Sequence, residues 1–77
     1  MKEFIEYVAK KLVDKPENVI VEETNPDENT KAFTLNTDKD DIGKVIGKHG
    51  RIADSIRTIL TAASAKEKRR TILEILE

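Results

Sequence analysis

The sequence predicts an α+β fold with the element order α-β-β-α-α-β and a three-stranded mixed sheet that carries its helices on one face. Three observations predict it: an amphipathic pattern at the start of the chain, two β-rich segments separated by turn formers, and a glycine-interrupted helical region followed by an apolar C-terminal segment. The chain has 77 residues, so we expect residues 1–77 to form a single domain.

The first predicted helix ends before Pro16. Its apolar residues recur at helical spacing with charged residues between them: Phe4, Ile5, Val8, Ala9, Leu12 and Val13. Proline lacks an amide hydrogen and disfavours helical geometry in the residue before it, so the pattern stops here. We expect this helix to face the core and to take no direct part in binding.

Two strands are predicted next, over residues 18–24 and 31–37. Val19, Ile20 and Val21 form a β-branched run, and Phe33 and Leu35 alternate with polar residues, which places both on one face. Residues 24–30 between them are dense in turn formers and predict a loop. The two strands are therefore expected to pair as a hairpin.

A short helix and a longer helix follow, separated by glycines. Asp38 can cap the short helix, and Ile42, Val45 and Ile46 follow at helical spacing before Gly47 interrupts the pattern. The longer helix is predicted over residues 51–65. Its expected buried face consists of Ile52, Ile56, Ile59, Leu60 and Ala63.

The C-terminal segment, residues 70–77, fits two patterns. Thr71, Leu73 and Ile75 occupy alternate positions, which suits a strand, whereas Ile72, Leu73 and Leu76 suit a helix. Context favours the strand, because two helices between strands form a crossover, and a strand that follows a crossover can lie parallel to its predecessor. This strand would complete the sheet.

The net charge of −1 is distributed unevenly along the chain. Residues 1–42 hold six Lys and eleven Asp or Glu, a net charge of −5, whereas residues 43–77 hold eight Lys or Arg and four acids, a net charge of +4. Local clustering sets the potential that a polyanion meets. The simpler alternative is that both halves are solvated faces of an ordinary small protein.

All three glycines lie between residues 43 and 50. Gly47 and Gly50 allow a tight turn and a close approach to the backbone, and the helix that begins at Arg51 directs unpaired amides to the same place. Lys44, Lys48 and Arg51 add positive charge there, and His49 adds a titratable group. The pattern predicts a phosphate-binding loop, with a plain turn bearing solvated lysines as the alternative.

Other function classes find little support in the sequence. The spacing of Gly43, Gly47 and Gly50 fits neither a P-loop nor a dinucleotide fingerprint. The chain has no Cys and a single His, so we expect no metal, no cofactor and no catalytic site. It shows no signal peptide pattern and no apolar run of about 20 residues, so we expect a cytoplasmic protein that does not engage a membrane.

Residues 42–51, IGKVIGKHGR, resemble the signature of KH domains, an apolar pair followed by G-x-x-G. The predicted element order is that of the type II KH fold, and the resemblance covers the whole chain. It is similar to stand-alone bacterial domains of this type. The departure from the pattern is Ala53, which stands where a large aliphatic is usual, so either Ile52 or Ala53 lines the groove beside the loop.

The resemblance implies a division of labour among the site residues. Gly47 and Gly50 hold the loop shape, while Lys48, His49 and Arg51 face the sugar-phosphate backbone; KH domains clamp about four nucleotides with this loop. The expected RNA-binding set is Lys44, Ile46, Gly47, Lys48, His49, Gly50 and Arg51. Ile42, Val45, Ile46 and Ile52 are candidates for apolar contacts to bases, and residues 25–30 match the variable loop that often forms a second wall.

Single-stranded RNA, bound with little sequence selectivity, is the leading expectation for the ligand. One domain offers a small footprint, so the resemblance also implies a homodimer or a heterodimer with a larger KH protein. The alternatives are a protein-interaction module with auxiliary nucleic-acid binding, single-stranded DNA binding, and duplex DNA binding through helix-turn-helix geometry. Asp54, Ser55 and Arg57 give the helix after the turn few groups for reading a major groove.

Overall fold

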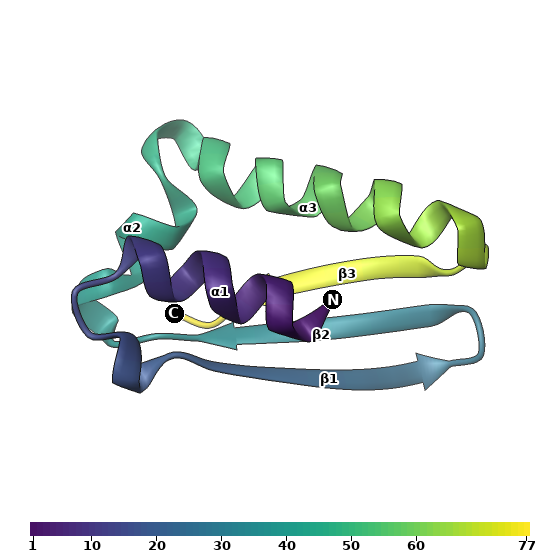
Figure 1. Cartoon of the computed structure of the whole chain (residues 1–77), viewed down its shortest axis with the longest axis horizontal. Helices are drawn as coiled ribbons and strands as arrows, with labels where there is room; N and C mark the ends of the chain where they lie inside the picture. Colours follow the sequence, from purple (N-terminus) through teal and green to yellow (C-terminus); the bar gives the residue numbers. More distant parts are fainter.

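The computed structural model describes all 77 residues and confirms the predicted element order (Figure 1). The helices and strands are α1 (Lys2–Leu12), β1 (Ile20–Asp27), β2 (Thr30–Asn36), α2 (Ile42–Ile46), α3 (Arg51–Ser64) and β3 (Arg70–Ile75). Short 3-10 segments lie between them: η1 (Pro16–Asn18), η2 (Lys39–Asp41), η3 (Lys48–Gly50) and η4 (Ala65–Glu67). The prediction that Asp38 caps the short helix is wrong: Asp38 caps η2, where its Oδ1 accepts the Asp40 amide at 3.0 Å, and the N-cap of α2 is Asp41, which makes no capping hydrogen bond with its side chain.

The sheet has the strand order β1-β2-β3, with β1 antiparallel and β3 parallel to the central β2. Phe33 of β2 lies opposite Glu23 of β1 and Leu73 of β3. The C-terminal segment is therefore the predicted strand, and the sheet is mixed. All three helices cover one face of it, which is the arrangement of the type II KH fold (Figure 1).

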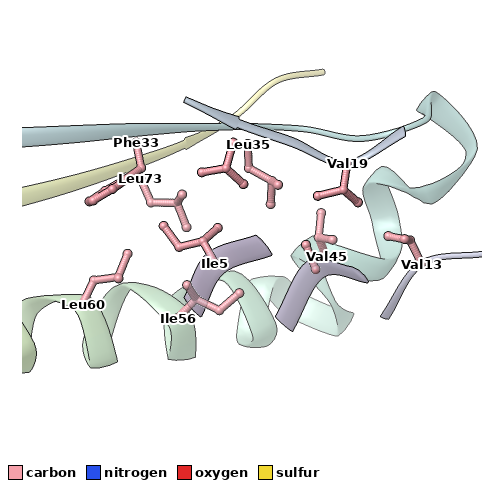
Figure 2. Close-up of a cluster of buried hydrophobic side chains, with 11 residues drawn as sticks. Ile5, Val13, Val19, Phe33, Leu35, Val45, Ile56, Leu60 and Leu73 are labelled. Atoms are coloured by element: carbon pink, nitrogen blue, oxygen red, sulfur yellow. The ribbon is translucent and has the colours of Figure 1, made fainter. Parts of the chain in front are cut away.

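The hydrophobic core lies between the sheet and the helices (Figure 2). Phe33 and Leu35 point from β2 into it, as their alternation predicted, and Ile5 and Ala9 enter from α1. The rest of this cluster of buried residues consists of Val13, Val19, Val21, Val45, Ile56, Leu60 and Leu73. The removal of apolar surface from water at this interface is the main favourable term that holds the helices on the sheet.

The hairpin is longer than predicted. β1 starts at Ile20, because Asn18 belongs to η1, and it continues to Asp27 through residues expected to form a loop. β1 is an edge strand, and its register with β2 shifts between Thr24 and Asp27, so Pro26 sits where a missing amide hydrogen is tolerated. Asp27 Oδ1 accepts the Asn29 amide at 2.8 Å and closes the two-residue turn.

The buried face of α3 also differs from the prediction. Ile56 and Leu60 are buried as expected, but Ile59 is 50% exposed, and the stripe is completed by Ala53 and Ser64 instead. Small residues at both ends of the stripe allow α3 to approach the sheet closely, and the buried Ser64 hydroxyl is satisfied by a hydrogen bond with Thr71 of β3. The spacing of apolar residues predicted that Ile59 and Ala63 are buried too, but both lie beside this stripe and are exposed.

Candidate nucleic-acid interface

The loop between α2 and α3 has a backbone shape that requires its glycines. Gly47 ends α2 with φ 78° and ψ 172°, a region that essentially only glycine occupies, and Gly50 has φ 74° and ψ 12°. His49 lies between them in the left-handed region at φ 58°. The Gly50 amide donates to the Gly47 carbonyl at 3.1 Å, which closes the turn.

The predicted backbone-contacting residues lie on the outside of this turn. Lys48, His49 and Arg51 are all exposed, and neither Lys48 nor Arg51 takes part in an ion pair. No side chain caps the N-terminus of α3, so the positive end of the helix dipole is open beside these cations. The loop therefore offers a polyanion two unpaired positive charges, an imidazole and the uncapped end of a helix.

Lys44, the fourth predicted cation, has a different environment. Its Nζ donates to Asp14 Oδ2 at 2.6 Å and to Asp41 Oδ1 at 3.0 Å, which ties α2 to the chain after α1. Hydrogen bonds to these two carboxylates raise the pKa of Lys44 above its usual range. Its charge is therefore already neutralised by partners within the protein.

Asp41 is the buried member of this group, with 1% of its surface exposed. Burial by itself acts to raise the pKa of Asp41, but hydrogen bonds from Lys44 Nζ and from the backbone amide of Lys15, at 3.1 Å, outweigh it. The net result is a pKa below the ordinary value, so Asp41 is ionised at neutral pH. The cluster holds α2, and with it the start of the loop, in a fixed position.

A groove of about 530 Å³ runs beside the loop, between the first turns of α3 and the second half of β3. Ile46, Gly50 and Ala53 line its helical side, and Leu73 and Ile75 line the strand side. Of the two open alternatives, Ala53 lines the groove, whereas Ile52 packs beneath Gly47. Val45 is fully buried in the core, so among the predicted apolar contacts Ile46 is the residue that reaches the groove.

Sequence reasoning missed the polar residues of this groove. Asp54 and Arg57 come from α3, and Glu74 and Glu77 come from β3 and the segment after it. Arg57 Nη1 donates to Asp54 Oδ1 at 3.3 Å, and the spacing of these two residues by three on a helix is a signal that the sequence did contain. The residues of β3 reach the groove only because β3 pairs with β2, and no pattern within residues 70–75 of the sequence indicates this position.

The expectation that residues 25–30 form a second wall of the groove is wrong. The Arg70 amide donates to the Asn29 carbonyl at 2.7 Å, and Arg69 Nη2 donates to Asn25 Oδ1 at 2.8 Å, so the hairpin tip adjoins the chain after α3. The loop at Gly47–Gly50 precedes α3, at its other end, about 21 Å away along a helix of this length. The tip and the loop lie at opposite ends of the molecule (Figure 1).

The remaining polar residues near the loop have structural partners. Ser55 Oγ donates to the Arg51 carbonyl at 2.8 Å and so bonds to its own helix.

No group of three or more His, Cys, Asp or Glu is placed to hold a metal ion. None of the helices has the length and apolar character needed to cross a membrane.

Comparison with known proteins agrees with this geometry. Residues 2–75 match the family model described as "KhpA/KhpB, KH domain". Proteins named "RNA-binding protein KhpA" are similar to this chain over nearly their full lengths. The protein of Clostridium perfringens is 49% identical, and the match covers 99% of this chain and 100% of the relative. The protein of Chlamydia trachomatis is 46% identical, and the match covers 100% of this chain and 97% of the relative. The relative from Aquifex aeolicus, with the same name, is 48% identical over 100% of this chain and 96% of its own. No solved structure matches. The chain belongs to the KhpA/KhpB family of KH domains.

Proposed function

We propose that this protein binds single-stranded RNA through the loop Gly47-Lys48-His49-Gly50, with little sequence selectivity, and that residues 1–77 act as one KH domain. The observation that carries the proposal is an exposed, glycine-shaped basic turn at the uncapped N-terminus of α3, directly beside a groove with apolar walls. A phosphate binds at the turn, while a base enters the groove. Relatives named as RNA-binding proteins support the choice of ligand.

The charges of the two surfaces support this orientation of the strand. Lys48 and Arg51 attract phosphates to the loop, whereas the residues that line the groove include one cation, Arg57, and the acidic residues Asp54, Glu74 and Glu77. Carboxylates at the groove repel a phosphate but accept hydrogen bonds from the amino groups of bases. The backbone therefore follows the loop and the bases face the groove. Lys44 takes part through its hold on α2, because its ammonium group is already bound by Asp14 and Asp41.

Two or three phosphate contacts give modest affinity, so a second binding surface is part of the proposal. The protein acts as a homodimer or together with a larger KH protein of the KhpB type, because linked domains gain affinity through effective concentration. The family description, which joins KhpA and KhpB, supports the second possibility. We place the protein in the cytoplasm, where such RNA is found. Sedimentation of the protein alone distinguishes a monomer from a dimer.

A protein-interaction role has one observation in its favour. Ile20 and Ile72 alternate with the buried Val21 and Leu73, so they lie on the sheet face that no helix covers, and they are 52% and 40% exposed. A contiguous apolar patch on an open sheet face is a surface for a partner, although the register sets Ile20 beside Asn36 and Ile72 beside Ala32. If this role is the main one, a variant defective in RNA binding retains its protein partner.

The direct test is the double variant Lys48→Asp with His49→Asp. Both side chains are exposed, so the fold is retained while an ammonium group and an imidazole become two carboxylates that repel phosphate. We expect binding to fluorescent single-stranded RNA, followed by anisotropy at low salt, to be abolished. The matched control, Lys10→Asp with Lys11→Asn, makes the same change of charge on α1 and retains binding. Equal binding by both variants would remove the loop from the mechanism, and competition by single-stranded and duplex DNA identifies the preferred nucleic acid.

A further inference from the structure

We infer that a basic cluster beyond the C-terminal end of α3, residues 66–70, is a second phosphate-binding surface for RNA that extends past the groove. The inference rests on the proposed binding of single-stranded RNA and lengthens the footprint of that RNA on the protein. The cluster runs from η4 to the first residue of β3, at the end of the molecule opposite the Gly47–Gly50 loop (Figure 1). Its four cations are Lys66, Lys68, Arg69 and Arg70.

The positive charge of the cluster is not neutralised within the protein. None of its four cations takes part in an ion pair, and all of them except Arg69 are exposed. Glu67, the one acid in the cluster, is instead bound by Lys31 Nζ at 3.3 Å. The hairpin tip that adjoins the cluster adds two further acids, Asp27 and Glu28. Cations therefore outnumber carboxylates at this end of the molecule, and the local potential attracts a polyanion.

Arg69 is held in place by the hairpin tip. Its Nη2 donates to Asn25 Oδ1 at 2.8 Å, and its Nε is buried without a hydrogen-bond partner. Nη1 has no partner in the protein and is not among the buried nitrogens, so its two N–H donors are accessible to solvent. A guanidinium group that is fixed on one side binds phosphate oxygens on its free side with little further loss of conformational freedom.

One face of β3 leads from the groove to the cluster. Ile72 and Glu74 line the groove, and Arg70 precedes them at the same alternation, so these three residues lie on one face of the strand. Arg70 is therefore about 7 Å from Ile72 along β3. Lys68, where η4 ends, is the next exposed cation. An RNA strand whose bases occupy the groove can thus place its following phosphates beside Arg70 and then beside Lys68.

The separation of the two surfaces sets the length of RNA that reaches both. The loop and the cluster lie at the two ends of α3, a helix about 21 Å long. KH domains clamp about four nucleotides at the loop, and 21 Å corresponds to about six more at about 3.4 Å per phosphate. An RNA of about five nucleotides is therefore confined to the loop and the groove, whereas one of about fifteen reaches the cluster.

Fluorescent U5 and U15 test this inference by anisotropy at low salt. The cluster variant removes three exposed positive charges and keeps the contact between Arg69 and Asn25. It carries the substitutions Lys66→Gln, Lys68→Gln and Arg70→Gln. We expect this variant to bind U15 at least about fivefold more weakly than the wild type does, and to bind U5 within about twofold of the wild type.

A matched control removes the same charge from exposed positions on α1. It carries the substitutions Lys2→Gln, Lys10→Gln and Lys11→Gln, and it should bind both RNAs within about twofold of the wild type. Salt dependence gives a second measurement. In the wild type, the slope of log K against log salt concentration should be steeper for U15 than for U5 by about 2 to 3, and in the cluster variant by less than about 1.

Three results would overturn the inference: unchanged binding of U15 by the cluster variant, an equal loss of affinity for U5 and U15, or an equal loss for U15 in the α1 control. If the cluster variant does not fold, the wild-type backbone amides of residues 66–70 provide the answer, because their resonances should shift with U15 and not with U5. Failure of the proposed function is distinguishable. In that case the loop variant Lys48→Asp with His49→Asp binds U5 as the wild type does.

Discussion

Ile52 lies directly against the α-carbon of Gly47, so closely that a Cβ atom on residue 47 would stand 2.6 Å from Ile52 Cγ1 and 2.8 Å from Ile52 Cβ. The first turn of α3 thus packs beneath Gly47, the residue that follows α2. The loop is built on this contact, because any side chain at position 47 would push the two helices apart. Gly47 is required both by its φ of +78° and by the space around it.

Three glycine-to-alanine variants separate these two requirements. Gly47→Ala should cost more than about 2 kcal/mol, since it combines a glycine-only backbone region with a collision. Gly50→Ala meets open space at φ +74° and should cost about 1–2 kcal/mol. Gly43→Ala, within α2 and also in open space, should be neutral or stabilising by up to about 1 kcal/mol. Urea unfolding measures all three, and equal costs at positions 47 and 50 would contradict the packing role of Ile52.

Lys44 and Lys48 are expected to differ in what their removal changes. Lys44→Ala leaves the buried Asp41 without its ammonium partner, so it should lower the free energy of unfolding. Lys48→Ala removes an exposed, unpaired charge and should leave stability unchanged while weakening RNA binding. Thermal unfolding and RNA titration of both variants provide the comparison. The assignment of Lys44 to a positioning role fails if its loss weakens binding at unchanged stability.

The stability of the protein should fall in acid, and Asp41 should contribute to the fall. Its pKa is lower in the folded protein than in the unfolded chain, so the unfolded state takes up more protons as the pH drops. The stabilisation is fully present above about pH 4 and is lost as the pH falls through the folded pKa. Urea unfolding between about pH 6 and pH 2 should therefore show a weaker pH dependence in Asp41→Asn than in the wild type.

A residual dependence on pH is expected in Asp41→Asn, because Asp38 also has a lowered pKa. Its carboxylate accepts the Asp40 amide and lies near Lys15 Nζ. If the free energy of unfolding of Asp41→Asn fell with decreasing pH as steeply as that of the wild type, Asp41 would not contribute to the acid sensitivity.

RNA binding should depend on salt in proportion to the few phosphates that the loop contacts. With two or three phosphates neutralised, the slope of log K against log salt concentration should be about −1.4 to −2.1 for a single strand. Arg51→Ala should reduce the magnitude of this slope by about 0.7. A slope near zero in the wild-type protein would contradict a phosphate-binding loop.

The sequence predicted the elements whose causes are local. The short helix ends where Gly47 interrupts it, and alternation around Phe33 and Leu35 reports a strand with one buried face. The wrong predictions concern features set by strand pairing and packing, which the local composition does not report. The turn formers of residues 24–30 suggested a loop, but pairing of Asp27 with Thr30 continues the hairpin through them.

The candidate site divides in the same way. The loop residues Gly47 to Arg51 are contiguous, so the sequence displays them together. The partner of Lys44 is 30 residues away at Asp14, and the wall that faces Ala53 is supplied by Leu73 of β3. The rotation of α3, which buries Ala53 and exposes Ile59, follows from the turn at Gly50 and from packing on the sheet, and neither is visible in hydrophobic periodicity.

The most direct test of the proposed interface is a titration of ¹⁵N-labelled protein with a short single-stranded RNA, followed by the shifts of the backbone amide resonances. The account predicts the largest shifts at Gly47 to Ala53 and along Leu73 to Ile75, with no change at the hairpin tip around Glu28. Shifts centred on the hairpin tip or on the open face of the sheet, with the Gly47–Gly50 amides unmoved, would contradict it.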